Sequence, residues 1–263
     1  MRISNNGPAA SAARFTAWAE RTISAEEAEA FRAARQSAGI RSAVAHDSYL
    51  INLASPDPVL WERSVQAFKA ELVRATTLGL DAVVSHPGNY LDDAARGIRR
   101  AAEGYSVCLQ AVPGEVMVLL ETTAGTGTTL GARFEELREL RDQIDSSVRG
   151  RVAFCADTCH LHSAGYDLIN DYEGVWQAWD RILGLDLLRC FHFNDSVTSF
   201  GARRDRHALI GKGTMGYAPF RRLMADPRFV AVPKILETPK GDDEVSNDRR
   251  TIRLLTRYAS ARG

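Results

Sequence analysis

The chain has 263 residues, which is close to the usual length of one eight-stranded β/α barrel and enough to bury a full core. A hydrophobic content of 45% and a charged content of 25% are those of an ordinary globular protein. The formal net charge of +0 argues against a nucleic-acid binder that depends on overall basicity, although cations bound in one cleft would create a local field.

Strand and helix patterns alternate from about residue 24, which favours an α/β fold with a parallel sheet. Ser24 and Glu27 form a capping box for the first helix, and Asp57 with Pro58 begins the second, which Gly79 ends. The predicted helices cover 25–38, 58–78, 91–111, 132–148, 172–183, a short segment from 218, and 244–260. The predicted strands end at 46 and 86 and cover 115–121, 151–157, 187–193 and 233–237.

The chain shows no repeat and no linker, so residues 1–263 are predicted to form one domain, with 1–23 as an atypical first segment. The cysteines are interpreted as core thiols rather than as metal ligands or disulfides; they are Cys108, Cys155, Cys159 and Cys190. No apolar stretch reaches the ~18 residues that span a bilayer, and the N-terminus lacks the apolar core of a secretory signal. We therefore expect a cytoplasmic protein without membrane association.

Acidic and imidazole side chains recur where predicted strands give way to loops. They are His46, His86, Glu121, Asp157, His160, His192 and Glu237, and a later loop adds Asp205 and His207. A hydrophobic run that ends in a metal-type ligand, repeated along the chain, indicates a barrel whose strand ends all face one site. Nine ligands exceed what one metal uses, so the pattern predicts a multinuclear centre. Mixed carboxylates and imidazoles suit zinc or manganese.

Seven local sequences resemble the endonuclease IV family of zinc-dependent apurinic/apyrimidinic-site DNA-repair enzymes. They are HDSYLINLA (46–54), HPG (86–88), ETTAGTGTTLG (121–131), DTCHLHSAGYDL (157–168), HFNDS (192–196), DRHALIGKGTMG (205–216) and ILET (235–238). The resemblance implies a xylose-isomerase-like TIM barrel. It also implies a monomeric deoxyribonuclease of base excision repair. Such an enzyme hydrolyses the phosphodiester 5′ to abasic sites in double-stranded DNA and leaves a 3′-hydroxyl and a 5′-deoxyribose phosphate.

The same resemblance implies three zinc ions per chain, with manganese admissible at one site. The implied ligand sets are His46, His86 and Glu121 for the first ion, Glu121, Asp157, His192 and Glu237 for the second, and His160, Asp205 and His207 for the third. Glu121 and Glu237 are expected to orient or deprotonate the attacking water, and the sequence does not rank them. A carboxylate has two oxygens, which suits Glu121 to bridging.

The resemblance also implies contacts with DNA. Tyr49 and Leu50 match the family's pair that enters the duplex beside the lesion, where a wedge compensates for lost stacking. The alternative for this pair is a core position at a turn. Arg203 and Arg206, with Arg204 between them, flank the third ligand set and are candidates for phosphate contacts. Lys212 lies in GKG, which is too short for a phosphate-binding fingerprint.

The first β/α unit is the point of departure from the family pattern. The family's opening strand and Gly-rich loop are not recognisable here, and residues 13–18 offer at most one short strand. We therefore expect a barrel that is missing or altered in its first unit, either because the true reading frame begins upstream or because the barrel is divergent. The strand ending at Glu237 would then expose an edge, and the strand before His46 would be poorly covered as well. We therefore expect the chain to associate through that edge.

Two other functions compete with this interpretation. One is a xylose-isomerase-like sugar isomerase or epimerase, whose barrel also carries acids and histidines at its strand ends but binds one or two metals. The set His160, Asp205 and His207 argues against it. The other is a catalytically impaired DNA- or metal-binding relic, which the altered first unit suggests.

Overall fold

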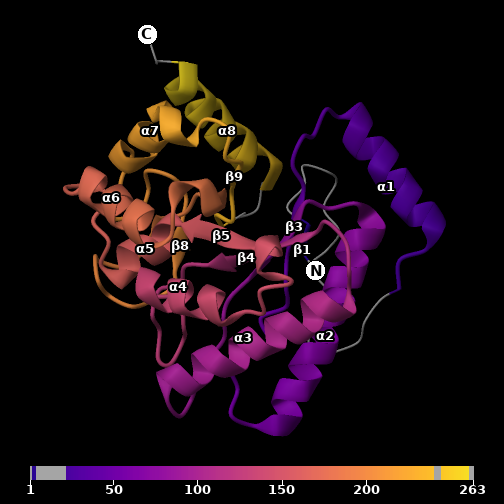
Figure 1. Cartoon of the computed structure of the whole chain (residues 1–263). Helices are drawn as coiled ribbons and strands as arrows, with labels where there is room; N and C mark the ends of the chain where they lie inside the picture. The colour runs from indigo at the N-terminus through magenta and orange to yellow at the C-terminus, as the bar shows by residue number, and fades with distance from the viewer. Residues whose placement is uncertain (1, 4–21, 240–243, 261–263) are drawn as a thin grey trace. The chain divides into compact units, whose positions relative to one another are not determined.

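The structure is a computed structural model that describes residues 2–3, 22–239 and 244–260. Its contacts divide the chain into two compact units, residues 1–120 with 139–153 (unit 1) and residues 121–138 with 154–263 (unit 2). Figure 1 labels the elements. The division falls within β4 (Met117–Glu121), α4 (Phe134–Gln143) and β5 (Val152–Asp157), so each of these passes from one unit to the other.

In unit 1, β2 (Val44–His46), β3 (Ala82–Ser85) and β4 run parallel, with Ala45 opposite Val83 and Val83 opposite Val118. β1 (Arg2–Ile3) pairs antiparallel with β2. The strand before His46, which we expected to be poorly covered, therefore has a partner on that side. The predicted strand within 13–18 lies outside the described residues.

Three helices cover the strands of unit 1: α1 (Ala25–Ser37), α2 (Pro58–Leu78) and α3 (Ala94–Ala111). The predicted capping box of α1 is present, since Ser24 and Glu27 exchange hydrogen bonds. Asp57 caps α2, and Gly79 ends it in the left-handed conformation at φ 68° that glycine adopts without strain. α2 packs against α1, α3 and β3.

In unit 2, β5 pairs in parallel with β6 (Leu188–His192), and β6 pairs in parallel with β9 (Lys234–Ile235). β7 (Asp195–Ser196) and β8 (His207–Ala208) form a short antiparallel pair. The remaining α-helices are α5 (Thr158–Ala164), α6 (Tyr172–Ile182), α7 (Ala218–Ala225) and α8 (Glu244–Ser260). Single 3₁₀ turns lie at η1 (Arg149–Arg151), η2 (Leu185–Leu187) and η3 (Pro227–Phe229).

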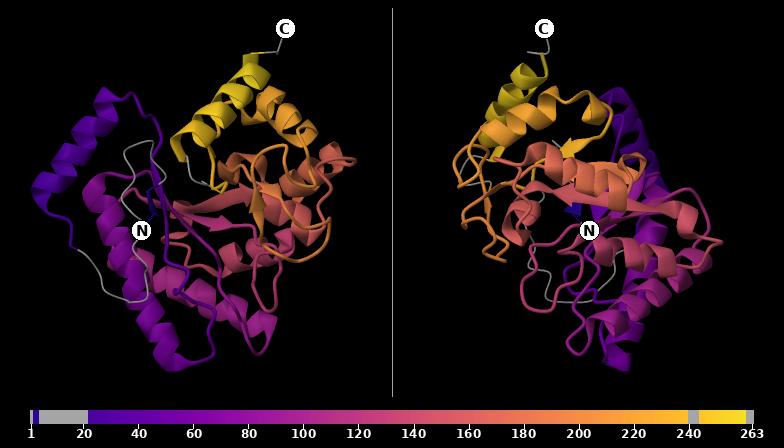
Figure 2. Two further views of the ribbon diagram at one scale, coloured as in Figure 1. Left: turned by 180° about the vertical axis from the view of Figure 1, so that it is seen from behind. Right: turned by 60° about the vertical axis from the view of Figure 1, so that its left-hand side comes forward.

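An aromatic cluster forms the core of unit 2. Trp176 of α6 packs against Phe191 of β6 and Phe229 of η3, with ring centroids 5.6 and 4.6 Å apart. Trp179 extends the cluster to Phe154 of β5. In Figure 2, α7 and α8, in orange and yellow, lie side by side, and the contacts between them agree. This packing holds β5, β6 and their ends in place.

The structure differs from the sequence prediction at two elements near the strand ends. α5 was not predicted; it begins directly after β5, where the Asp157 side chain caps it by accepting a hydrogen bond from the His160 amide. The strand predicted at 233–237 is only two residues long, so Glu237 lies two residues beyond β9. As a result, the predicted ligand His160 lies on a helix and the predicted ligand Glu237 lies in a loop.

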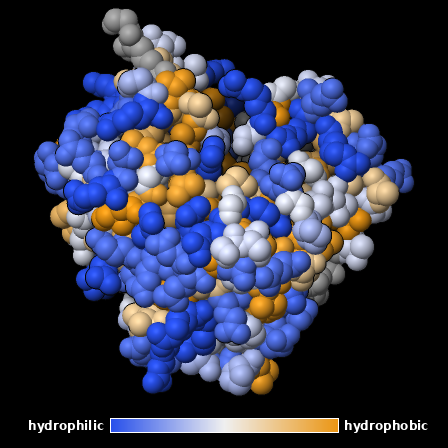
Figure 3. Space-filling model, viewed as in Figure 1, coloured by the Kyte–Doolittle hydropathy of each residue, from blue (hydrophilic) through white to orange (hydrophobic). Residues whose placement is uncertain are grey.

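The surface mixes polar and apolar residues. On the face shown in Figure 3, blue hydrophilic side chains predominate, and orange apolar side chains gather in patches between them, as is usual on a protein surface. No helix within the described ranges is long and apolar enough to cross a membrane. The four cysteines are all buried and free, as expected of core thiols without disulfides, and the absence of a metal-binding role for them stays a prediction.

Candidate metal centre

In unit 2, four predicted ligands converge from neighbouring strand ends. Asp157 ends β5 and lies opposite His192, which ends β6. His192 Nδ1 is 2.8 Å from Glu121 Oε1 and 3.2 Å from Glu237 Oε2. One donor atom from each of the four residues lies within 4.8 Å of the others. Because parallel strands present their carboxyl ends at one edge, the register of β5 and β6 brings Asp157 and His192 together, and the ends of β4 and β9 bring Glu121 and Glu237 close to them.

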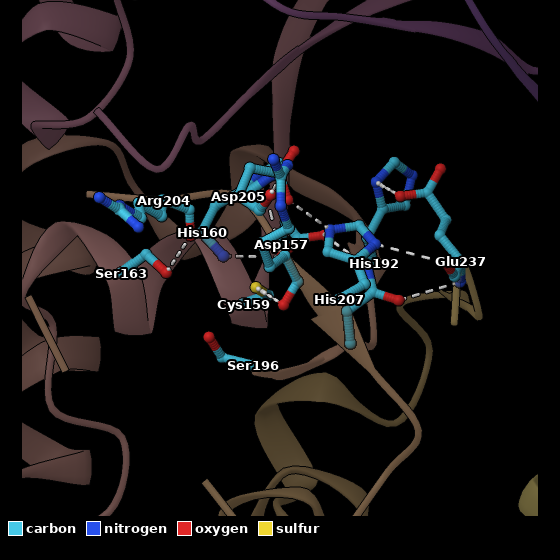
Figure 4. Close-up of polar contacts among 12 residues, drawn as sticks. Asp157, Cys159, His160, Ser163, His192, Ser196, Arg204, Asp205, His207 and Glu237 are labelled. Carbon is cyan, nitrogen blue, oxygen red and sulfur yellow. Dashed lines mark hydrogen bonds and ion pairs between the residues drawn. The ribbon is translucent and has the colours of Figure 1, made fainter. Parts of the chain in front are cut away.

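The predicted third set also assembles in unit 2. The Asp205 carboxylate lies between two imidazoles, with Oδ2 3.2 Å from His160 Nε2 and Oδ1 3.1 Å from His207 Nε2. His160 comes from α5, and His207 begins β8. Figure 4 shows these side chains turned toward one another, with Asp157 close by. The spacing of two residues between Asp205 and His207 places both on one side of an extended backbone, as the sequence predicted.

Asp157 links the two sets. Its Oδ2 is 3.6 Å from His207 Nε2, and its Oδ1 is 3.9 Å from His160 Nδ1. The donor atoms of Asp157, His160 and His207 also lie within 4.8 Å of one another. The two sets therefore form one continuous cluster rather than two separate sites.

Backbone carbonyls orient two of the imidazoles. His160 Nδ1 is 2.7 Å from the Thr122 carbonyl oxygen, and His207 Nδ1 is 3.3 Å from that of Glu237. In each ring a proton on Nδ1 would be donated to the carbonyl, so the Nε2 lone pair faces Asp205. A hydrogen bond on the far nitrogen is the usual support of a metal-binding histidine.

The electrostatic field of the cluster favours positive charge. Burial raises the pKa of Asp205, but the adjacent imidazoles of His160 and His207 outweigh it and hold this pKa well below its usual range. Burial lowers the pKa of His207, but the carboxylates of Asp157 and Asp205 outweigh it and raise this pKa to about 9. A bound cation would satisfy the same field and take the place of the protons.

In unit 1, His46 ends β2 and His86 follows β3, and their rings meet edge to face with centroids 5.1 Å apart. Asp47, the next residue after His46, is buried beside the His46 ring. Its carboxylate is 3.4 Å from His46 Nδ1 and accepts a hydrogen bond of 2.6 Å from Ser85. The pairing of these two histidines agrees with their predicted place in one ligand set, and their sharing of an ion with Glu121 stays a prediction.

A search of protein families matches residues 9–258 to the xylose isomerase-like TIM barrel. The chain is 46% identical over 246 residues to the "Probable endonuclease 4" of Geobacter sulfurreducens, covering 91% of this chain and 82% of that protein. It is also 46% identical to the "Probable endonuclease 4" of Chloroflexus aggregans, covering 90% of this chain and 84% of the other. This chain belongs to the endonuclease IV family.

A solved structure agrees with this family. The endonuclease IV of Thermus thermophilus superposes with a TM-score of 0.81 at 37% identity, covering 93% of this chain and 85% of that one. A D-tagatose 3-epimerase-like protein at 18% identity and a TM-score of 0.69 shares the fold alone. The predictions of a TIM-barrel α/β fold and of an endonuclease IV-type enzyme are confirmed.

The endonuclease IV family implies a metal, and the side chains of unit 2 fit one. Nε2 of His207 is buried and makes no hydrogen bond within the described residues, although Asp205 Oδ1 is 3.1 Å away. His207 Nε2 and Asp205 Oδ1 therefore lie at a separation that suits two ligands of one metal ion. Imidazole nitrogens and carboxylate oxygens are ligands that zinc accepts.

The predicted DNA contacts are exposed except for Leu50. The Tyr49 side chain is 80% exposed, which excludes a core position for it, and Leu50 is half-buried. Arg203, Arg204 and Arg206 are exposed as well. His162, which the sequence left without a role, is buried and lies 3.2 Å from the Thr214 hydroxyl through Nε2.

Two buried residues of the HFNDS motif went unrecognised as contributors to the site. Asn194 contacts Asp157 and Glu237. The carboxylate of Asp195 accepts hydrogen bonds from the backbone amides of Gly211, Gly213 and Met215. The two glycines of the GKG sequence thus donate hydrogen bonds to the buried Asp195 carboxylate. They shape the loop that follows β8. The partners of both residues are distant in the sequence, so no local signal marked them.

We expect Gly213→Ala to destabilise the protein by about 1–3 kcal/mol, as overpacking of a closed site does. An added Cβ would collide with the Ser196 carbonyl and the Asp195 carboxylate. Gly150→Ala is the control, because open space surrounds Gly150. Urea unfolding would measure the free energy of unfolding of both variants. Equal stabilities for the two variants would contradict the close packing of this loop.

Proposed function

We propose that the chain is a zinc-dependent endonuclease that cleaves DNA on the 5′ side of abasic sites during base excision repair in the cytoplasm. The observation that carries the proposal is the convergence of carboxylates and imidazoles in unit 2, in a member of the endonuclease IV family. Double-stranded DNA with an abasic site would be the substrate. One barrel domain acting as a monomer would suffice, because unit 2 alone supplies seven of the nine predicted ligands.

Three zinc ions would be held as the resemblance implies, with manganese admissible at one site. The ligand sets are His46, His86 and Glu121, then Glu121, Asp157, His192 and Glu237, and finally His160, Asp205 and His207. Bound zinc supplies Lewis-acid charge for the phosphate and lowers the pKa of water. The carboxylates and imidazoles of the protein form the anionic, mostly buried cluster that would hold the zinc ions.

The two candidate catalytic glutamates differ in exposure. Glu121 is fully buried and lies 2.8 Å from His192, which suits it to bridging two ions. The Glu237 side chain is 30% exposed, so it can meet water and substrate. We therefore assign the orientation or deprotonation of the attacking water to Glu237. Asp205, whose side chain is 46% exposed, opens the third set to the substrate.

Recognition of the lesion would rest on the exposed residues that follow His46. The Tyr49 side chain is 80% exposed and would occupy the space left by a missing base. Arg203 and Arg206 would contact phosphates on either side of the third ligand set. The backbone of Arg203 has φ 52°, an unfavourable conformation that fixes the course of this loop.

We expect the double substitution Tyr49→Ala with Leu50→Ala to weaken binding to abasic duplex by about 1–3 kcal/mol, the usual contribution of one stacking contact. Binding to intact duplex should change much less, because phosphate contacts are made on any duplex. Binding curves on both duplexes at one salt concentration test this. Val59→Ala, which truncates an exposed apolar side chain on α2, is the control. Equal losses of affinity for both duplexes would contradict the insertion of Tyr49 and Leu50 at the abasic site.

An incision assay tests the function itself. The substrate is an end-labelled duplex with one abasic site, and the matched duplex has thymine at that position. We expect a single cut 5′ to the abasic site with a 3′-hydroxyl end, no cut in the matched duplex, and loss of activity in chelator that added zinc restores. No incision by zinc-loaded protein, or cleavage on the 3′ side, would overturn the proposal.

A further inference from the structure

Asn194 is a fully buried amide at the centre of the ligand cluster of unit 2. It lies between β6 and β7, two residues after His192. Its Nδ2 donates a hydrogen bond of 2.6 Å to Asp157 Oδ2. Its Oδ1 accepts one of 3.0 Å from the backbone amide of Glu237. One side chain therefore connects two predicted ligands whose positions in the sequence differ by 80 residues.

The orientation of this amide follows from its partners. The Glu237 backbone N–H can only donate, so Oδ1 of Asn194 must face it, and Nδ2 must then face Asp157. The backbone of Asn194 is held as well, since its N–H donates to Thr158 Oγ1 at 2.9 Å and its carbonyl accepts from that hydroxyl at 2.7 Å. The amide has no freedom to turn without leaving buried polar groups unpaired.

The contact with Asp157 completes the support of that carboxylate. Oδ1 of Asp157 accepts a hydrogen bond of 2.8 Å from the His160 backbone amide, and Oδ2 accepts the one from Asn194. Each oxygen keeps a lone pair for a cation, because a carboxylate oxygen has two acceptor positions. Two fixed donors define the direction in which those lone pairs point. Partners of this kind set the affinity of a metal site as the ligands themselves do.

We propose that Asn194 is a positioning residue that holds the Asp157 carboxylate and the Glu237 main chain in the relative placement that metal binding requires. This inference rests on the proposed metal centre and extends it to a residue that binds no metal. Its consequence is specific. Loss of the amide should weaken metal retention and leave the metal-free fold standing.

Two variants separate the contacts. Asn194→Asp preserves size and the acceptor for the Glu237 amide, but it places a second carboxylate against Asp157. Asn194→Ser removes both side-chain contacts. We expect each variant to lose zinc to a chromophoric chelator about 10- to 100-fold faster than the parent, the range typical of lost outer-shell support. The control is Tyr172→Phe, which also removes a buried hydrogen bond to a carboxylate, of 2.9 Å to Asp226.

The experiment compares zinc release, the absorption spectrum after cobalt substitution, and melting in chelator, where every variant is metal-free. We expect altered cobalt spectra and rapid zinc release for the Asn194 variants. Their metal-free melting temperatures should stay close to that of Tyr172→Phe. Zinc release at the Tyr172→Phe rate would overturn the proposal, and so would metal-free unfolding of both Asn194 variants. These readouts need no DNA, so a failure of the incision assay would not be mistaken for a failure of this inference.

Discussion

Asp205→Ala should lower the turnover of abasic-site incision by about 100- to 1,000-fold, which corresponds to about 3–4 kcal/mol of lost transition-state stabilisation. Its carboxylate stands between His160 and His207, so its removal takes one ligand from the third set and leaves two imidazoles facing each other. His207→Ala should behave alike. Binding to abasic duplex should stay close to that of the parent, because few backbone contacts are lost.

Single-turnover incision and equilibrium binding on the same duplex measure this separation. Glu135→Ala is the matched control, since it removes an exposed carboxylate on α4 away from the cluster. Incision by Asp205→Ala at the parent rate would show that the third set has no catalytic role. A proportional loss of binding would show instead that Asp205 acts through DNA contact.

Glu121→Gln should have the largest effect of any single substitution in the cluster. The glutamine preserves the volume of a fully buried side chain but removes the charge that faces His192 Nδ1 at 2.8 Å. Because Glu121 is assigned to two ions, we expect the variant to retain about one zinc per chain and to incise more than about 1,000-fold more slowly than the parent.

A second buried carboxylate offers a control for this result. Glu71 of α2 lies in unit 1 and pairs with Arg74 at 2.8 Å, away from the predicted ligands. Glu71→Gln should keep the zinc content and the activity of the parent, even if it lowers the melting temperature. A Glu121→Gln protein with full zinc content and incision within about tenfold of the parent would show that Glu121 bridges nothing.

Local sequence signals predicted most of the helix boundaries. The capping box of Ser24 and Glu27 marks the start of α1, and Asp57 and Gly79 mark the two ends of α2. Each signal acts on the adjacent turn of helix, so it is recognisable without knowledge of the fold. The convergence of Asp157 and His192 was also predictable, because parallel strands in register bring their ends together. The same reasoning paired His46 with His86 in unit 1.

Residues that act through tertiary contacts were not predictable in this way. The partners of Asn194 lie 37 and 43 residues away in the sequence, and those of Asp195 come from a loop about twenty residues later. No local pattern distinguishes such a buried amide from a turn residue. α5 was missed because it is only 7 residues long and begins directly at the end of β5, with no connecting loop to mark its start.

The zinc content of the protein purified without chelator decides whether the centre is trinuclear. We expect about three zinc ions per folded chain, since nine ligands with Glu121 as a bridge fill three sites and leave positions for water and phosphate. The measurement is elemental analysis of monodisperse protein, with zinc expressed per mole of chain. One metal ion or fewer per fully folded chain would contradict the trinuclear centre.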